Sequence, residues 1–472
     1  MANITGTEGA DTLRGTNIKI DPVTPGNSLG SGDDTITALG GNDIIIGSNG
    51  IDKIDGGAGN DTLDYSKIGK GLFLEPSGSF IDTVGFRRRS SPDPTELAAT
   101  SSIANVETII GDPTQSNTIN DFTGFAFDRS EFDINLSTGR VLTLFNNITY
   151  TVKNFDNITL PGGTGRFVGN DRDNQINVGD TAVITASKGN DTLRGGTLDY
   201  SNLGQAIKFS PTLLEVFSTA GIYGNINKGN VGVDRINTDK LSGLQKIIGT
   251  TNKVNTLDLS TINQVSIVDL NLSTNSLNVK NPYYDPNNPF STPNLSTQVI
   301  NFVDAFGSKG NDKIVGGNKN SKLTGGGGND TITGGSKNDI ITGSDRTARG
   351  VGEVDILTGG GGRDKFILGD KNGAYYVGKG NDDYATITDF NLFQDSISIG
   401  SLKNYSFAAD GNNTIELYSG KDVKTRDLIA KIQLAGEISN ASSNSRSIAG
   451  SSPNVDAIIS KIDIISETNL TG

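Results

Sequence analysis

The sequence predicts an all-β protein: a parallel β-roll, or β-solenoid, built from glycine-rich nonapeptide repeats with interspersed β spacers. Three observations lead to this fold class. Aspartates recur at a spacing of nine residues in two arrays, each followed two positions later by an apolar residue. Glycine accounts for 62 of the 472 residues. Helix signals are weak throughout, whereas short β-branched runs bounded by Gly, Asn and Asp indicate strands and turns.

The first array covers residues 29–64 and consists of four consecutive nine-residue units. Its aspartates are Asp34, Asp43, Asp52 and Asp61, and their apolar partners are Ile36, Ile45, Ile54 and Leu63. The first six residues of a unit, of the type Gly-Gly-x-Gly-Asn-Asp, form a turn, because glycine adopts positive φ without a Cβ penalty. The last three residues form a short strand whose middle side chain points inward. Each unit therefore supplies one turn and one core residue.

The second array covers residues 307–367 and repeats the pattern with two departures. The residues at its aspartate position are Asp312, Ser321, Asp330, Asp339, Asp355 and Asp364, with apolar partners Ile314, Leu323, Ile332, Ile341, Leu357 and Phe366. Ser321 replaces one aspartate, and a seven-residue insertion lies around residues 346–352. Isolated copies of the motif contain Asp11 and Asp191, and their participation stays open at this point.

The middle of the chain holds a longer duplication. Asp64-Tyr65-Ser66 recurs as Asp199-Tyr200-Ser201, and Ile109-Ile110-Gly111 recurs as Ile247-Ile248-Gly249. We interpret the copies as two β spacer modules, the second with a Pro/Asn-rich insertion at residues 282–293. The predicted order is an N-terminal roll (1–64), spacer copy 1 (65–190), spacer copy 2 (191–306), a C-terminal roll (307–368), a cap (369–436) and a tail (437–472).

The composition excludes several kinds of chemistry. The chain has neither histidine nor cysteine, so Ser-His-Asp and Cys-His catalysis and Cys/His zinc sites are ruled out. Its formal net charge of −13 argues against nucleic acid or an anionic membrane surface as the partner. No apolar run approaches the roughly 18 residues that a membrane span requires. Carboxylate, amide and carbonyl oxygens remain, and these are the ligands of hard cations such as calcium.

The repeat spacing predicts where a cation would bind. Two units complete one coil of 18 residues, so aspartates 18 positions apart are expected on the same flank. The expected groups are Asp34 with Asp52, Asp43 with Asp61, Asp312 with Asp330 and Asp355, and Ser321 with Asp339 and Asp364. Two stacked turns would then bring two carboxylates and several glycine carbonyls around one cavity, which suits calcium. Ser321 is expected to keep its turn but to weaken or empty its site.

We therefore predict several bound Ca²⁺ ions. The candidate ligand residues are Gly30, Gly32, Asp34, Gly41, Asp43, Gly50, Asp52, Gly57, Gly59, Asp61, Gly310, Asp312, Gly326, Gly328, Asp330, Asp339, Asp355, Gly360, Gly362 and Asp364. A unit buries one Ile or Leu, worth roughly 2 kcal/mol, while ordering about nine residues costs roughly 1–2 kcal/mol each. Apolar burial alone is insufficient, so calcium is expected to drive folding of the arrays.

These motifs resemble those of the RTX, or repeats-in-toxin, family. The segment from Val351 to Ile399, with Tyr375-Tyr376 and Asp389-Phe390 followed by Asp395, is similar to the closing region that caps the roll in cyanobacterial members. The resemblance implies a secreted protein exported by type I machinery, which explains why no N-terminal signal peptide is seen. It also implies an uncleaved C-terminal signal, placed here at about Asn454–Gly472. No pore-forming region, His-Glu-x-x-His protease motif or lipase histidine accompanies the repeats.

Three functions remain open. The favoured one is a calcium-stiffened structural protein of the cell surface or matrix without enzymatic activity, and self-assembly stays open within it. The second is a module that binds polysaccharide or protein through Tyr283-Tyr284 or the aromatic cluster at residues 122–132, although core packing is the better explanation of that cluster. The least favoured is a carboxylate-based polysaccharide enzyme. Its candidate acids are Glu75, Glu96, Glu107, Glu131 and Glu215.

Overall fold

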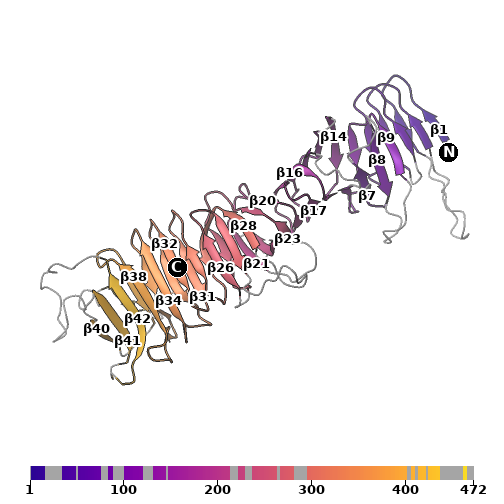
Figure 1. The fold of residues 1–472 in the computed structure, drawn as a ribbon. Coiled ribbons are helices and arrows are strands. Elements are labelled where there is room, and N and C mark those ends of the chain that lie inside the picture. Colours follow the sequence, from indigo (N-terminus) through magenta and orange to yellow (C-terminus); the bar gives the residue numbers. More distant parts are fainter. Residues whose placement is uncertain are drawn as a thin grey trace, which may run out of the picture. The chain divides into compact units, whose positions relative to one another are not determined.

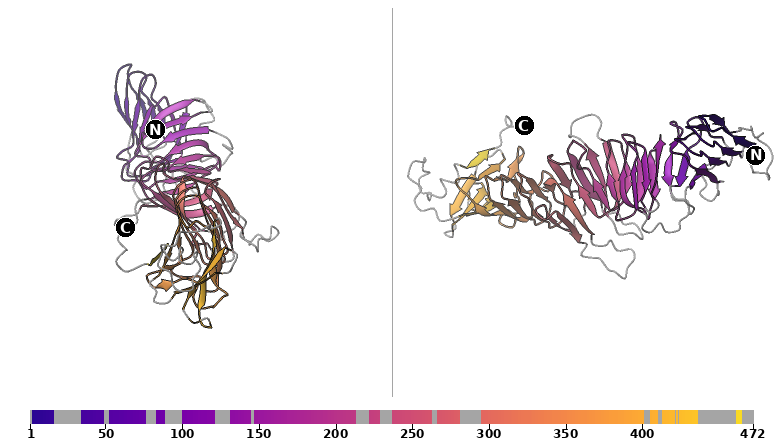
Figure 2. Two further views of the ribbon diagram at one scale, coloured as in Figure 1. Left: turned by 90° about the vertical axis from the view of Figure 1, so that its left-hand side faces the viewer. Right: turned by 90° about the horizontal axis from the view of Figure 1, so that it is seen from above.

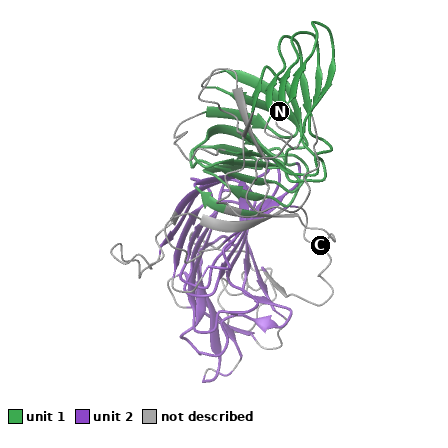
Figure 3. Cartoon of the chain, turned by 90° about the vertical axis from the view of Figure 1, so that its right-hand side faces the viewer, with its two compact units in different colours: residues 1–203, 237–244 green, residues 204–236, 245–472 purple. Residues whose placement is uncertain are grey.

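The computed structural model describes residues 2–15, 34–48, 52–75, 83–88, 100–120, 131–144, 147–212, 222–228, 237–262, 266–280, 295–400, 405–409, 413–420, 422, 424–435 and 461–464. The elements in this described part are short β-strands, and none of them is a helix. The chain forms two compact units, Met1–Leu203 with Asn237–Leu244, and Gly204–Ile236 with Gln245–Gly472 (Figure 3). The predicted all-β class is confirmed.

In the first unit the array forms a regular two-sheet coil (Figure 1). Its strands are β3 (Asp34–Thr37), β4 (Ile44–Ile46), β5 (Lys53–Asp55) and β6 (Thr62–Asp64). Strands β3 and β5 pair in parallel in one sheet, with Ile36 opposite Ile54. Strands β4 and β6 pair in parallel in the other sheet. Successive units therefore alternate between the sheets, and two units complete one coil as predicted.

The isolated copy at the N-terminus joins this array. Strands β1 (Ala2–Thr5) and β2 (Thr12–Arg14) pair in parallel with β3 and β4, with Ile4 opposite Ile36 and Leu13 opposite Ile45. The offset is 32 residues because a long segment, lying outside the described residues, separates the copies. The open question about Asp11 is thus answered for the fold: β1 and β2 together form one coil of the roll, and the unit with Asp11 supplies β2.

Spacer copy 1 continues both sheets and adds antiparallel hairpins to them. The other strands of the first unit that lie within the predicted copy 1 are β7 (Leu72–Glu75), β8 (Thr83–Arg88), β9 (Thr100–Ala104), β10 (Thr108–Ile110), β11 (Thr118–Asn120), β12 (Glu131–Asn135), β13 (Arg140–Thr143), β14 (Ile148–Lys153), β15 (Asn157–Leu160), β16 (Thr164–Val168), β17 (Gln175–Val178) and β18 (Val183–Thr185). The first unit also contains β19 (Thr192–Arg194), β20 (Thr197–Asp199) and β23 (Asn237–Leu244), which fall within the bounds predicted for copy 2. Strand β9 pairs in parallel with β5, and β10 with β6, so the spacer stacks directly on the array. The β7–β8–β9 and β12–β13–β14 segments are antiparallel.

In the second unit the order is reversed, and spacer copy 2 precedes its array. The spacer strands are β21 (Ile207–Thr212), β22 (Ile222–Lys228), β24 (Lys246–Ile248), β25 (Asn255–Asp258), β26 (Ile267–Asn271), β27 (Ser276–Lys280), β28 (Leu295–Ile300) and β29 (Phe302–Phe306). The array strands are β30 (Lys313–Val315), β31 (Lys322–Gly326), β32 (Thr331–Gly335), β33 (Ile340–Ser344), β34 (Val354–Gly360) and β35 (Lys365–Ile367). The right-hand view of Figure 2 shows these strands following one another side by side.

Strands β31 to β34 are longer than the three residues that the repeat pattern predicts. Each extends into the first two residues of the following turn, which are Gly-Gly in β31, β32 and β34 and Gly-Ser in β33, because the parallel pairing continues there, as between Gly335 and Gly360. The register offset is 18 residues from Ile314 to Ile332 but 25 from Ile332 to Leu357, because the insertion lies between β33 and β34. The insertion therefore leaves the stacking of the core residues unchanged.

Both spacer copies contain a buried asparagine whose side-chain amide forms hydrogen bonds with the backbone of a turn. The Asn117 side chain accepts the Leu72 N–H at 3.0 Å and donates to the carbonyls of Asp112 and Asn154. Asn255 makes the same set of bonds in copy 2, to Ile207, Thr250 and Asn301. Both side chains are fully buried. An amide suits this place because it carries both donor and acceptor atoms.

The C-terminal strands close the second unit. They are β36 (Gly369–Asp370), β37 (Gly373–Ala374), β38 (Tyr384–Phe390), β39 (Ser396–Ile399), β40 (Tyr405–Ala409), β41 (Thr414–Ser419), β42 (Asp427–Leu434) and β43 (Ile462–Ile464). Residues 424–432 could form a short helix or a strand by their sequence, and from Asp427 onward they belong to strand β42. The β43 backbone, inside the proposed export signal, pairs in parallel with β39, while the rest of the tail lies outside the described residues.

Candidate calcium sites

The aspartates of the first array stack in columns along the flanks of the roll. The Asp34 N–H donates to Oδ1 of Asp52 at 3.1 Å, and the Asp43 N–H donates to Oδ1 of Asp61 at 2.8 Å. All four side chains are buried. The predicted pairing of residues 18 positions apart is confirmed.

The second array has the same columns. On one flank the Asp312 N–H donates to Asp330, and the Asp330 N–H donates to Asp355, each at 2.8 Å. On the other flank the contacts run from Ser321 to Asp339 at 2.7 Å and from Asp339 to Asp364 at 2.8 Å. Ser321 keeps its turn, as expected, and its hydroxyl donates to the Lys319 carbonyl. It contributes no carboxylate to its column.

The second carboxylate oxygen distinguishes these columns from ordinary turns. Oδ2 of Asp43, Asp61, Asp330 and Asp364 is buried and accepts no hydrogen bond. A buried carboxylate oxygen without a partner costs at least about 1–3 kcal/mol, and buried charges are normally paired or bound to a metal. These four atoms therefore fit cation ligands.

Backbone carbonyl oxygens converge on the same places. A Cβ added at Gly325 would collide both with Oδ2 of Asp330 and with the carbonyl oxygen of Gly343, one coil further on. A Cβ at Gly307 would lie 2.6 Å from Oδ2 of Asp312 and would also collide with a carbonyl oxygen of the next coil. Glycine is required because carboxylate and carbonyl oxygens crowd this position. Such a mixture of oxygens is the ligand set that calcium prefers.

The electrostatics of the columns are unfavourable without a cation. Burial raises the pKa of Asp312 to about 6 and that of Asp355 to about 7. The pKa of Asp330 lies further above the ordinary range, because burial is joined by the charges of Asp355 and Asp312 on either side. The ionised forms are therefore destabilised in the folded array, and a divalent cation would offset this.

The column that contains Asp355 ends in a hydroxyl group. The fully buried Tyr376 donates its hydroxyl hydrogen to Oδ2 of Asp355 at 2.5 Å. The neighbouring Arg349 is held by Asp370 at 3.1 Å and lies over the Tyr375 ring, 5.3 Å from its centroid. Tyr376 thus fills the end of this column with protein atoms, while Tyr375 packs against Arg349.

The predicted ligand residues do not all fall on described residues. Gly30, Gly32 and Gly50 lie outside them. Gly41, Gly57, Gly59, Gly310, Gly326, Gly328, Gly360 and Gly362 lie in the stacked turns. Gly59 and Gly328 show why the motif needs glycine there, since their φ values are 148° and 99°. Within the described part of the chain, no three Asp or Glu side chains are grouped to hold a metal, so backbone oxygens would have to complete each site.

Sequence reasoning missed two carboxylates at column ends. Asp395 accepts the Asp364 N–H at 2.9 Å, and Glu107 accepts the Asp61 N–H at 2.6 Å. Both precede a buried isoleucine by two positions, as the array aspartates do. That local pattern was the available signal, although neither residue lies in a glycine-rich unit. The copy at Asp191 also enters a stack, since its Oδ1 accepts the Asn174 N–H at 2.9 Å.

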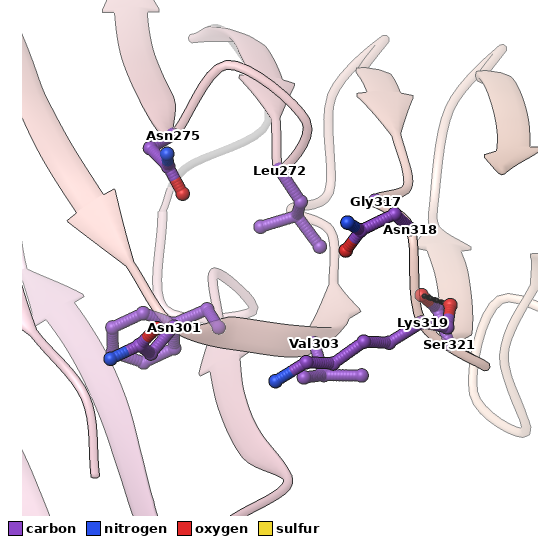
Figure 4. Close-up of a pocket in the computed structure, with 9 residues that line it drawn as sticks. Leu272, Asn275, Asn301, Val303, Gly317, Asn318, Lys319 and Ser321 are labelled. Carbon is purple, nitrogen blue, oxygen red and sulfur yellow. Dashed lines mark hydrogen bonds between the residues drawn. The ribbon is translucent and has the colours of Figure 1, made fainter. Parts of the chain in front are cut away.

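A pocket of about 100 Å³ lies where copy 2 meets the second array, beside Ser321 (Figure 4). Its lining includes Asn275, Asn301 and Lys319 but no carboxylate. It is smaller than the roughly 300–1,000 Å³ of typical ligand sites. The pocket therefore gives no support to carboxylate-based catalysis at this place.

Comparison with known families agrees with the geometry. The family model of the RTX calcium-binding nonapeptide repeat matches the chain in four copies, over residues 29–63, 179–197 and 306–345. The matched segments are thus RTX nonapeptide repeats, which are repeats of a calcium-binding type. None of the curated proteins searched matches it. Among the described residues there is no helix that is long and apolar enough to cross a membrane.

Proposed function

We propose that the stacked turns hold the calcium ions and that the protein folds on them outside the cell as a structural component of the surface or matrix. The observation that carries this proposal is the set of buried carboxylate oxygens without hydrogen-bond partners in both arrays. For Asp61 and Asp330 this oxygen lies close to a glycine position that a carbonyl oxygen of the neighbouring coil also approaches. The ion would replace repulsion between stacked carboxylates with coordination, and so would supply the folding energy that one buried apolar residue per unit does not.

The structural role is supported by the continuity of the coils. Spacer copy 1 pairs with the first array through Thr108 and Thr62, and copy 2 pairs with the second array through Leu270 and Ile314. In each unit, array and spacer therefore share both sheets and one apolar core. Such continuous stacking suits a rod that transmits force. Secretion by type I machinery, with Asn454–Gly472 as signal, is part of the same proposal.

A role in binding polysaccharide or protein is the second candidate. Phe132, the described member of the aromatic cluster, is buried and packs against Phe167 with ring centroids 6.4 Å apart, so it serves the core. The rest of the cluster and Tyr283-Tyr284 lie outside the described residues. Of the candidate acids, Glu107 lies beside Asp61, and Glu131 is exposed at the start of β12. Glu96 and Glu215 fall outside the described residues.

Calcium titration of the full chain tests the proposal. Protein stripped with chelator should gain β-structure in far-ultraviolet circular dichroism as calcium rises, with a midpoint near 10⁻⁴–10⁻³ M, as in extracellular modules. Magnesium should not replace calcium, because it demands tighter octahedral geometry. Size-exclusion chromatography of the same samples reports compaction and self-assembly. A fully β-rich, compact protein in excess chelator would contradict calcium-driven folding.

A further inference from the structure

Glu107 lies at the junction between the first array and spacer copy 1. It immediately precedes β10, which pairs in parallel with β6 so that Thr108 lies opposite Thr62. This register places Glu107 one coil beyond Asp61, in the position that an aspartate would take if the array continued. The side chain is half-buried there.

The contacts of Glu107 reproduce those inside the array. The Asp61 N–H donates to Oε2 of Glu107 at 2.6 Å, just as the Asp43 N–H donates to Oδ1 of Asp61 at 2.8 Å. Asp61 is 1% exposed, and its Oδ2 has no hydrogen-bond partner. Two carboxylates therefore approach each other at the junction, one of them buried with an unused oxygen.

The spacer also supplies a carbonyl oxygen. A Cβ added at Gly56 would lie 2.8 Å from Oδ2 of Asp61 and would collide with the carbonyl oxygen of Asn105. The same convergence of Oδ2 with a carbonyl of the next coil occurs at Gly307 inside the second array. The junction thus has a carboxylate and a carbonyl from the spacer facing a carboxylate from the repeat.

The duplication provides an internal comparison. In copy 2, Gly196 stands where copy 1 has Asp61, and Gln245 stands where copy 1 has Glu107. The backbone is equivalent, since Thr151 N–H donates to the Glu107 carbonyl at 2.7 Å and Gln298 N–H donates to the Gln245 carbonyl at 3.0 Å. Both acids are present in one copy and both are absent from the other. A purely structural acceptor for a backbone N–H would not require a charge.

We propose that Glu107 and the Asn105 carbonyl complete a calcium site with Asp61, so that one ion ties the first array to the spacer. The inference rests on calcium binding by the stacked turns. Glu107 stands outside the nonapeptide motif, and it extends the column that runs through Asp43 and Asp61 by one ion. The fold of this spacer edge then depends on calcium although no nonapeptide repeat is found at this edge.

The test compares Glu107→Gln with Glu131→Gln in the full chain. Glutamine keeps an oxygen for the Asp61 N–H but removes the charge, while Glu131 is exposed on the same spacer and serves as the matched control. Glu107→Gln should bind one calcium ion fewer by equilibrium dialysis and should lose calcium-dependent protection from hydrogen exchange over residues 108–110. Glu131→Gln should match the parent protein in both measurements.

A second variant guards against misfolding. Asp61→Gly combined with Glu107→Gln installs the pair found in copy 2, so it should fold, and it should bind two ions fewer than the parent, because Asp61 also shares an array site with Asp43. If Glu107→Gln binds as many ions as the parent, or if the double variant loses one ion only, the junction site is refuted while calcium binding by the arrays stands. If the parent protein itself binds no calcium, the proposed function fails instead.

Discussion

Replacing Asp330 should weaken the second array more than replacing Asp339. Asp330 lies between two carboxylates, Asp312 and Asp355, with backbone contacts of 2.8 Å on either side. Asp339 has a carboxylate neighbour on one side only, because Ser321 occupies the other. Asp330→Asn should therefore damage two ion sites, whereas Asp339→Asn should damage one.

The expected size of the difference follows from binding linkage. At free calcium about one hundred times the dissociation constant, each occupied site stabilises the folded state by about 2.7 kcal/mol. Asp330→Asn should lower the free energy of unfolding by about 5 kcal/mol, and Asp339→Asn by about 2.7 kcal/mol. Urea unfolding followed by circular dichroism at fixed free calcium measures both values. Equal losses in the two variants would show that the flank assignment is wrong.

The sign of the effect should reverse in chelator. Burial, together with the charges of Asp355 and Asp312, holds the pKa of Asp330 well above its usual range, so the ionised side chain destabilises the calcium-free array. Asparagine removes that charge while keeping an oxygen for the Asp312 N–H. Calcium-free Asp330→Asn should therefore contain more β-structure than the parent protein at pH 8. A loss of structure in chelator would refute the electrostatic reasoning.

Two further predictions concern pH and export. In chelator, the raised pKa values of Asp312 (about 6) and Asp355 (about 7) stabilise the fold fully below the ordinary value of 3.8, and this contribution is lost as pH rises through 6 and 7. Circular dichroism in chelator should thus show more β-structure at pH 4 than at pH 8. With calcium present, the protein should contain more β-structure at pH 8, because protons compete with the ion for the carboxylates. If the same pH gave more β-structure both with and without calcium, carboxylate ligands would be ruled out. Deleting residues 454–472 should retain the protein inside the producing cell while the purified variant still folds on calcium, apart from the loss of β43 beside β39. Normal amounts of the truncated protein in the medium would disprove the placement of the signal.

The repeat arrays could be predicted from sequence because one local rule generates them. A nine-residue period fixes which aspartates stack, and the fully buried Ile45, Leu63, Ile332 and Leu357 follow the predicted inward positions. The stacking pattern is also kept across the insertion before β34, because β32 and β34 pair in parallel although the inserted residues lie between them in the sequence. The family match to the repeats is consistent with this reading.

The ends of the columns could not be predicted in the same way. Glu107 reaches Asp61 across 46 positions, and Tyr376 reaches Asp355 from the β36–β37 hairpin, so neither contact has a fixed spacing. Asp11 joins the roll at an offset of 32 residues, which hides its phase. These contacts depend on where the chain returns to the stacked coils after a long intervening segment. That point is set by three-dimensional pairing of strands and leaves no period in the sequence.

The asparagine-closed turns at Asn117 and Asn255 have a mechanical consequence. Their side-chain amides hydrogen-bond the backbone groups of the turn without any ion, whereas the aspartate columns contain carboxylate oxygens that have no hydrogen-bond partner and could bind an ion. Each unit therefore joins a segment of constant stiffness to a segment whose stiffness follows the calcium concentration. Under tension at low calcium, the arrays should yield first and lengthen, and the spacers should hold. The compliance of the chain would then depend on the calcium concentration, and it would be confined to the two repeat arrays.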